Sequence, residues 1–210
     1  MPESKPKPDW LKPHGRPWEI TRSTDLYDNP WIGLTEHQAV APSGQFAPTY
    51  GVVRFKNLAV AVLPLHEDGT VTLVGQNRLP HGDYVWEVPE GGAPLDEDPL
   101  HAAERELKEE TGLIAAEWRC VLPTLQLSNA TTDERGIGFL AMNFTQAETE
   151  PDPTEDIATA RVPFREALDA ALEGWLPDLL TVAMLLRAHQ MAVTGELQPE
   201  LARAMLDAPA

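Results

Sequence analysis

Three acidic residues recur at close spacing in one segment of the chain, residues 91–113. Glu109 and Glu110 follow Glu106 by three and four positions. On a helix, side chains three or four residues apart lie within about 5 to 6 Å, so three carboxylates placed in this way repel one another. Hard oxygen ligands suit Mg²⁺ or Mn²⁺, and Mg²⁺ combines a few carboxylates with water and phosphate oxygens. The spacing therefore predicts a divalent-metal site and chemistry at a phosphate group.

The local sequence supplies a helix that can position these carboxylates. Asp98 offers a short side-chain oxygen to a free backbone N–H, and Pro99 suits the first helical position. Gly112 is suited to end the helix. At about 100° per residue, Leu100 and Leu107 fall on the buried face, and the three carboxylates centre about a quarter turn away. We therefore expect the carboxylates at the rim of the core.

On charge alone, the same segment is also typical of a solvated acidic helix face with Arg105 and Lys108 interleaved. A wider set of fixed positions favours the metal site over this alternative. These positions are Gly91, Glu97, Arg105, Glu106, Leu107, Glu109, Glu110, Gly112 and Leu113. The set resembles the Nudix box with no position missing.

This resemblance implies an α+β fold, a Nudix α/β/α sandwich with a mixed sheet, preceded by a small N-terminal antiparallel β-sheet region. It implies an enzyme that hydrolyses a nucleoside diphosphate linked to another group X. The implied metal ligands are Glu106, Glu109, Glu110 and the backbone carbonyl oxygen of Glu90, with Mg²⁺ as the cofactor and Mn²⁺ as a substitute. The implied structural residues of the box are Gly91, Glu97, Arg105 and Gly112, with Arg105 orienting the carboxylates by ion pairing.

Resemblance beyond the box points to the branch of ADP-ribose and nucleoside diphosphate sugar pyrophosphatases. Two of its segments are Gln76-Asn77-Arg78 and the run from Trp86 to Gly91, in which Arg78 and Glu87 correspond to residues near the substrate. An ion pair or a polar contact at a strand end explains Arg78 and Glu87 equally well. Both interpretations stay open at this point.

A third segment, residues 154–157, resembles the acidic loop that supplies a further metal ligand or the base for water. Glu155 is the candidate, together with Glu109 and Glu110, for the catalytic carboxylates. Several relatives have a glutamate where this chain has Pro153, so the group that deprotonates water stays open. The chain also lacks the proline-glycine pair of the branch, with residues 128–134 in its place, which weakens the assignment of ADP-ribose.

The resemblance implies Mg²⁺-dependent hydrolysis of ADP-ribose to AMP and ribose 5-phosphate. The alternatives are hydrolysis of GDP-mannose, NADH or another nucleoside diphosphate derivative. A domain that binds a nucleotide sugar as a sensor, without cleaving it, is the non-enzymatic alternative. Such domains usually lose glutamates of the box, and this box is complete, so we expect an enzyme.

Composition narrows the partners and the cellular location. With 16 basic and 33 acidic residues, the formal charge of −17 opposes binding to a long nucleic acid, which depends on Lys and Arg contacts to phosphates. A small anionic substrate can still be met locally by metal and a few arginines. The single Cys120 excludes an intramolecular disulfide. Without a secretory pattern or a long apolar segment, we expect a cytoplasmic protein that binds no membrane.

Four regions are expected along the chain. We expect a flexible tail at residues 1–13 and an antiparallel strand region at 14–56, which the resemblance implies is the homodimer interface. The Nudix hydrolase domain is expected at 57–195, and a C-terminal helix or tail at 196–210. Strands are predicted at 18–24, 31–41 and 50–55, then at 58–65 and 71–74 as a hairpin, and then at 84–88, 116–122, 136–144 and 157–162. Helices are predicted at 164–172 and 177–193.

Overall fold

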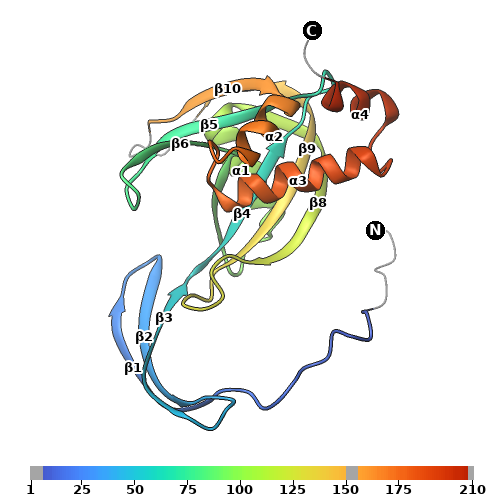
Figure 1. Cartoon of the computed structure of the whole chain (residues 1–210). Helices are drawn as coiled ribbons and strands as arrows, with labels where there is room; N and C mark the ends of the chain where they lie inside the picture. The colour runs from blue at the N-terminus through green and yellow to red at the C-terminus, as the bar shows by residue number, and fades with distance from the viewer. Residues whose placement is uncertain (1–6, 150–155, 208–210) are drawn as a thin grey trace. The chain divides into compact units, whose positions relative to one another are not determined.

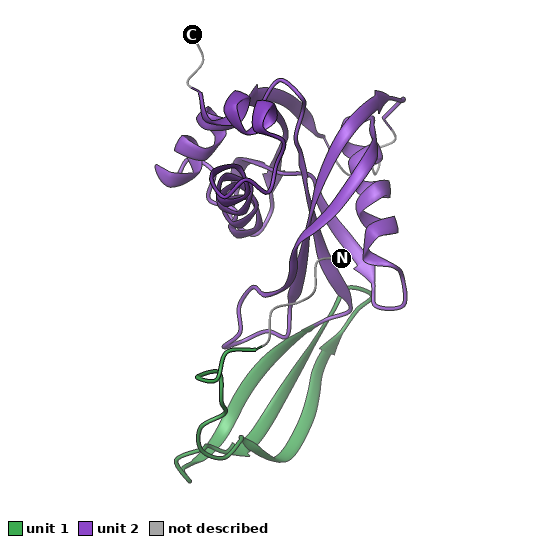
Figure 2. Cartoon of the chain, turned by 90° about the vertical axis from the view of Figure 1, so that its right-hand side faces the viewer, with its two compact units in different colours: residues 1–54 green, residues 55–210 purple. Residues whose placement is uncertain are grey.

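The computed structural model describes residues 7–149 and 156–207 (Figure 1). The chain divides into two compact units, residues 1–54 and 55–210, coloured separately in Figure 2. Among the described residues, no helix has the length and apolar character needed to cross a membrane.

The first unit is built on a three-stranded sheet. Its strands are β1 (Glu19–Asp28), β2 (Ile32–Val40) and β3 (Phe46–Phe55), hydrogen-bonded in that order, and β1 pairs antiparallel with β2. The three predicted strands are confirmed, but β3 starts at Phe46 rather than at residue 50, and it includes Pro48, a residue type that argues against a strand. Proline cannot donate to a sheet ladder, yet it is tolerated in an edge strand, which β3 is.

The second unit contains two sheets. One has the order β10-β5-β6, formed by Ala158–Pro163, Thr70–Arg78 and Asp83–Glu87. The other has the order β7-β4-β9-β8, formed by Glu90–Pro94, Asn57–Pro64, Arg135–Gln146 and Leu113–Gln126. In this second sheet β4 runs parallel to β9, while the pairs β4–β7 and β8–β9 are antiparallel. The predicted mixed sheet is confirmed.

Helices cover both faces of these sheets (Figure 1). α1 (Pro99–Thr111) packs on one face, and α2 (Phe164–Leu172), α3 (Leu179–Val193) and α4 (Pro199–Leu206) lie on the other. Both faces need a covering layer because successive side chains of β4 point to opposite faces and pack in two different hydrophobic cores. Val62 packs with Leu107 of α1, whereas Leu63 packs with Leu185 of α3. This layering is the α/β/α sandwich that the resemblance implies.

The hairpin predicted for residues 58–65 and 71–74 is wrong in its pairing. The two segments are strands, β4 and β5, but they belong to different sheets and share only an isolated bridge between Leu65 and Val71. Both strands are mostly buried and are central in their sheets, so each is hydrogen-bonded to a partner on both sides. The turn between them was predicted from local residues, but those long-range partners decide the pairing.

Candidate active site

The helix that carries the three carboxylates has the ends predicted from its sequence. The Asp98 carboxylate accepts the Leu100 N–H at 3.0 Å, and Pro99 is the first helical residue. Gly112 ends the helix with a φ of 70°, and its N–H donates to the Lys108 carbonyl at 2.8 Å. Glycine adopts this left-handed conformation at little cost. α1 is therefore fixed at both ends by local chemistry.

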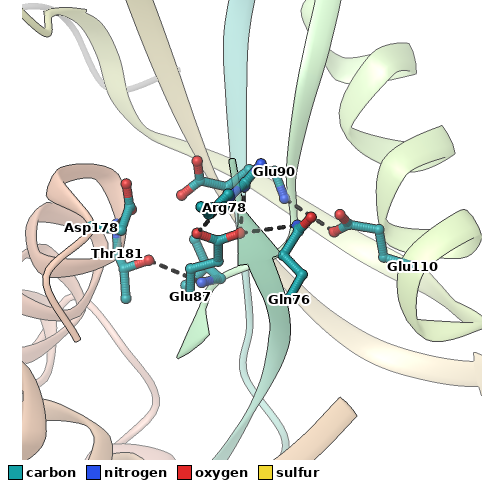
Figure 3. A network of polar contacts seen from close by, with 8 residues as sticks. Gln76, Arg78, Glu87, Glu90, Glu110, Asp178 and Thr181 are labelled. Atoms are coloured by element: carbon teal, nitrogen blue, oxygen red, sulfur yellow. Dashed lines mark hydrogen bonds and ion pairs between the residues drawn. The ribbon is translucent and has the colours of Figure 1, made fainter. Parts of the chain in front are cut away.

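Two of the three carboxylates reach the backbone of β7. Oε2 of Glu110 accepts the N–H of Glu90 at 3.1 Å (Figure 3), and Glu110 is only 4% exposed. The carboxyl group of Glu106 lies against Gly91, where a Cβ atom would stand 2.0 Å from Cδ of Glu106. Only glycine at this position leaves room for that carboxylate.

Arg105 links the third carboxylate, that of Glu109, to strand β7 by hydrogen bonds. Its Nη1 donates to Glu106 at 2.7 Å and to Glu109 at 3.1 Å, and its Nη2 donates to the carbonyl oxygen of Gly92 at 3.2 Å. Burial alone would lower the pKa of Arg105, but the two glutamates outweigh it and the pKa is raised. These contacts agree with the orienting role expected for Arg105.

The chemistry of this donor set fits a hard divalent cation. Glu106, Glu109, Glu110 and the carbonyl group of Glu90 offer oxygen atoms only, as Mg²⁺ and Mn²⁺ prefer. In the described part of the chain, no three His, Cys, Asp or Glu side chains are already arranged around a common metal position. Contacts to Arg105 and to the Glu90 N–H hold the carboxylates instead.

The two residues expected near the substrate are bonded to each other at the ends of β5 and β6 (Figure 3). Arg78 forms an ion pair with Glu87, and Gln76 donates to Glu87 at 3.1 Å. Burial raises the pKa of Glu87, although Arg78 and Gln76 act against that shift. The charges of Glu90 and Glu110 also help to raise the pKa of Arg78, which burial alone would lower. The ion pair therefore lies beside the box, with Arg78 still partly exposed.

Two residues at the start of α3 also reach this region, the N-cap residue Asp178 and Thr181, and the sequence did not assign either of them to the site. Asp178 caps α3 by accepting the Thr181 N–H at 2.6 Å, and the Thr181 hydroxyl accepts the Val88 N–H at 3.0 Å (Figure 3). The side chain of Glu90 is buried next to Asp178, and burial, followed by the charge and hydrogen bond of Asp178, raises its pKa well above the ordinary value. Pro177 and Asp178 signal a helix start, but no sequence pattern links that start to the box.

The other predicted site residues lie farther from these contacts or outside the described residues. Glu155 falls in residues 150–155, which the structure does not describe. Glu97 is half-buried immediately before α1, and its N–H donates to the Pro94 carbonyl at 2.9 Å. This places Glu97 in the turn that leads into the helix.

Comparison with known proteins identifies the family. The model described as NUDIX domain matches residues 55–181. The chain belongs to the Nudix family. It is a Nudix hydrolase, an enzyme acting on pyrophosphate bonds, and such hydrolases generally use divalent metal ions. A second model, described as Nucleoside diphosphate sugar hydrolase N-terminal domain, matches residues 18–53.

Individual relatives extend the similarity beyond the box. The chain is 29% identical over 185 residues to an ADP-ribose pyrophosphatase of Mycobacterium tuberculosis, covering 87% of each chain. It is 32% identical over 118 residues to an ADP-ribose pyrophosphatase of Bacillus subtilis, covering 56% of this chain and 60% of that one. A solved structure described as an ADP compounds hydrolase superposes with a TM-score of 0.77 at 17% identity, covering 89% of this chain and all of the other. That superposition supports the shared fold.

Proposed function

We propose that this Nudix hydrolase cleaves the diphosphate bond of a nucleoside diphosphate sugar, with ADP-ribose as the substrate and AMP and ribose 5-phosphate as products. The observation that carries the proposal is the convergence of Glu106, Glu110 and the Arg78–Glu87 pair around the backbone of Glu90 and Gly91. The N-terminal match to nucleoside diphosphate sugar hydrolases and the similarity to ADP-ribose pyrophosphatases support the choice of substrate.

Glu106, Glu109, Glu110 and the carbonyl oxygen of Glu90 would hold Mg²⁺. When bound, the metal supplies charge neutralisation at the phosphate oxygens and makes water a better nucleophile. A carboxylate among Glu109, Glu110 and Glu155 takes the proton from the attacking water. The new bond joins the water oxygen to one phosphorus, the bond from that phosphorus to the bridging oxygen breaks, and the other phosphate leaves with the bridging oxygen.

Arg78 has a separate role in this proposal, because its guanidinium group is partly exposed while its partner Glu87 is buried. A planar guanidinium can donate two parallel hydrogen bonds to phosphate oxygens, which fixes the orientation of the diphosphate. Glu87 holds Arg78 in position from the buried side and lies at the edge of the substrate site.

The first unit is the proposed homodimer interface. Every residue of the edge strand β1 is exposed, and large apolar side chains in this unit face solvent, among them Trp18, Tyr27, Trp31 and Phe46. Exposed apolar surface of this kind marks interaction sites. Sedimentation of the purified protein should give the mass of a dimer, and a monomer at micromolar concentration would refute this assignment. We also propose that the enzyme acts in the cytoplasm.

Product analysis tests the proposed activity. The purified protein is incubated with Mg²⁺ and a panel of ADP-ribose, GDP-mannose, UDP-glucose, NADH, diadenosine polyphosphate and nucleoside triphosphates. AMP and ribose 5-phosphate should form from ADP-ribose faster than any other substrate is cleaved, and EDTA should stop the reaction. Preference for GDP-mannose or NADH would contradict the substrate assignment and retain the hydrolase chemistry.

A further inference from the structure

One polar side chain, that of Thr181, lies on the buried face of α3. The other buried residues of this helix are Leu180, Met184, Leu185, Ala188, Met191 and Ala192. Valine has nearly the same shape as threonine and would suit this apolar face without the cost of burying a hydroxyl group. A threonine here therefore calls for a polar partner. That partner is the buried N–H of Val88, which donates to Oγ1 of Thr181 at 3.0 Å (Figure 3).

Val88 and Pro89 form the crossing between the two sheets of the second unit. β6 ends at Glu87 and β7 begins at Glu90, so the two residues of the crossing belong to neither sheet. Pro89 has no N–H and a fixed φ, and a residue that precedes proline is held to extended conformations. The crossing is therefore stiff, and a shift at Val88 is passed on to Glu90.

Three elements hold the crossing and the residue that follows it. The carbonyl oxygen of Pro89 accepts the Val62 N–H of β4 at 2.9 Å, and the Glu90 N–H donates to Glu110 of α1 at 3.1 Å. The hydroxyl group of Thr181 holds the crossing from the side of α3. The backbone of Thr181 is itself fixed, because its N–H donates at 2.6 Å to the carboxylate that caps α3.

We propose that Thr181 is a positioning residue for diphosphate hydrolysis, because its hydroxyl group fixes the backbone N–H of Val88. Through the stiff crossing, this bond sets the direction of the Glu90 carbonyl oxygen and of the Glu87 carboxylate that holds Arg78. The inference rests on the proposed function and gives α3 a part in it.

The test removes the hydroxyl group and keeps the shape of the side chain. In Thr181→Val the Val88 N–H must move to another partner or stay unpaired, and both are costly. A misplacement of about 1 Å can cost about a hundredfold in rate, and the bonds at Pro89 and Glu90 limit the movement, so kcat/KM for ADP-ribose should fall about tenfold. Mn²⁺ affinity, measured by electron paramagnetic resonance without substrate, should fall about tenfold, as when a metal ligand loses its supporting contacts.

Two other substitutions of Thr181 separate the hydroxyl group from the packing. Thr181→Ser keeps the acceptor, so kcat/KM and Mn²⁺ affinity should stay within about twofold of the unmodified enzyme, although the lost methyl group lowers Tm. Thr181→Cys supplies only a weak acceptor and should give intermediate values. If Thr181→Val does not fold, the comparison of Thr181→Cys with Thr181→Ser decides the question.

Thr194→Val is the matched control. Thr194 is the exposed C-cap residue of the same helix, about 20 Å along the axis from Thr181, and its hydroxyl group donates to the Gln190 carbonyl at 2.8 Å. Loss of this hydrogen bond should leave kcat/KM and Mn²⁺ affinity within about twofold of the unmodified enzyme, in line with surface substitutions.

Normal kcat/KM and normal Mn²⁺ affinity in Thr181→Val, with a lower Tm alone, would overturn the positioning role and leave Thr181 as a folding contact. Equal losses in Thr181→Val and Thr181→Ser would also overturn it, because the effect would then not follow the hydroxyl group. If the unmodified enzyme cleaved no diphosphate substrate, the proposed function would fail. The Mn²⁺ affinities of the same variants would still decide whether Thr181 positions the metal ligand.

Discussion

Replacing Gly91 by alanine should separate catalysis from folding. The added Cβ atom would lie 2.0 Å from Cδ and 2.1 Å from Oε1 of Glu106, whereas ordinary contacts begin at 3.4 Å. The Glu106 carboxylate must therefore move by more than about 1 Å, and a displacement of that size can cost about a hundredfold in rate. Folding should change little, because the atoms that must move form the end of a flexible side chain, and Gly91 is not among the glycines with positive φ.

The assay measures kcat/KM for ADP-ribose with Mg²⁺, Mn²⁺ affinity by electron paramagnetic resonance, and Tm. We expect a loss of about a hundredfold in kcat/KM, weaker Mn²⁺ binding and an almost unchanged Tm. Gly51→Ala is the matched control, because a Cβ atom at Gly51 meets nothing within 4 Å. A Gly91→Ala variant with normal activity and normal Mn²⁺ affinity would refute the placement of Glu106 against β7 as part of the metal site.

Three further substitutions test other contacts. Glu110→Gln removes a charge but keeps an acceptor for the Glu90 N–H, so kcat should fall at least about a hundredfold with little change in Tm, and a near-normal rate would contradict its role as a metal ligand. Arg78→Ala should raise the KM for ADP-ribose about tenfold and also lower Tm, because Glu87 stays buried without its ion pair; a lower Tm with unchanged KM would make Arg78 purely structural. The hydrogen bond from Arg187 lowers the pKa of Glu196 to about 2, so Glu196→Gln should lower Tm at pH 7. The Tm difference between the variant and the unmodified protein should disappear as the pH falls through the ordinary Glu range toward about 2. A Tm difference that does not vary with pH would contradict this pairing.

The parts of the site that local sequence determines could be predicted. The ends of α1 follow from Asp98, Pro99 and Gly112, since capping and left-handed φ depend on single residues. The place of Glu106 and Glu110 beside the core follows from helical spacing. The family resemblance implied that the carbonyl oxygen of Glu90 would join these carboxylates at the metal. It did not predict the contact of Glu106 with Gly91 or the hydrogen bond from the Glu90 N–H to Glu110.

Contacts between distant segments could not be predicted in the same way. β4 and β5 looked like a hairpin, but their partners are β9 and β10, which lie far along the chain. The contact between Glu90 and Asp178 joins positions that no sequence pattern relates. The strands β3 and β8 were predicted too short, in part because they contain Pro48 and Pro123. Proline is tolerated in an edge strand, but the sequence alone does not show that these two strands lie at sheet edges.

Hydrolysis of ADP-ribose by the full-length protein in heavy-oxygen water with Mg²⁺, followed by mass spectrometry of the products, tests the proposed activity at the level of the bond that breaks. The products should be AMP and ribose 5-phosphate, with one heavy oxygen on the phosphate of one of them. EDTA should abolish cleavage, and Glu110→Gln should slow it at least about a hundredfold. Heavy oxygen in free ribose with release of ADP, or intact ADP-ribose after prolonged incubation, would contradict the proposed activity.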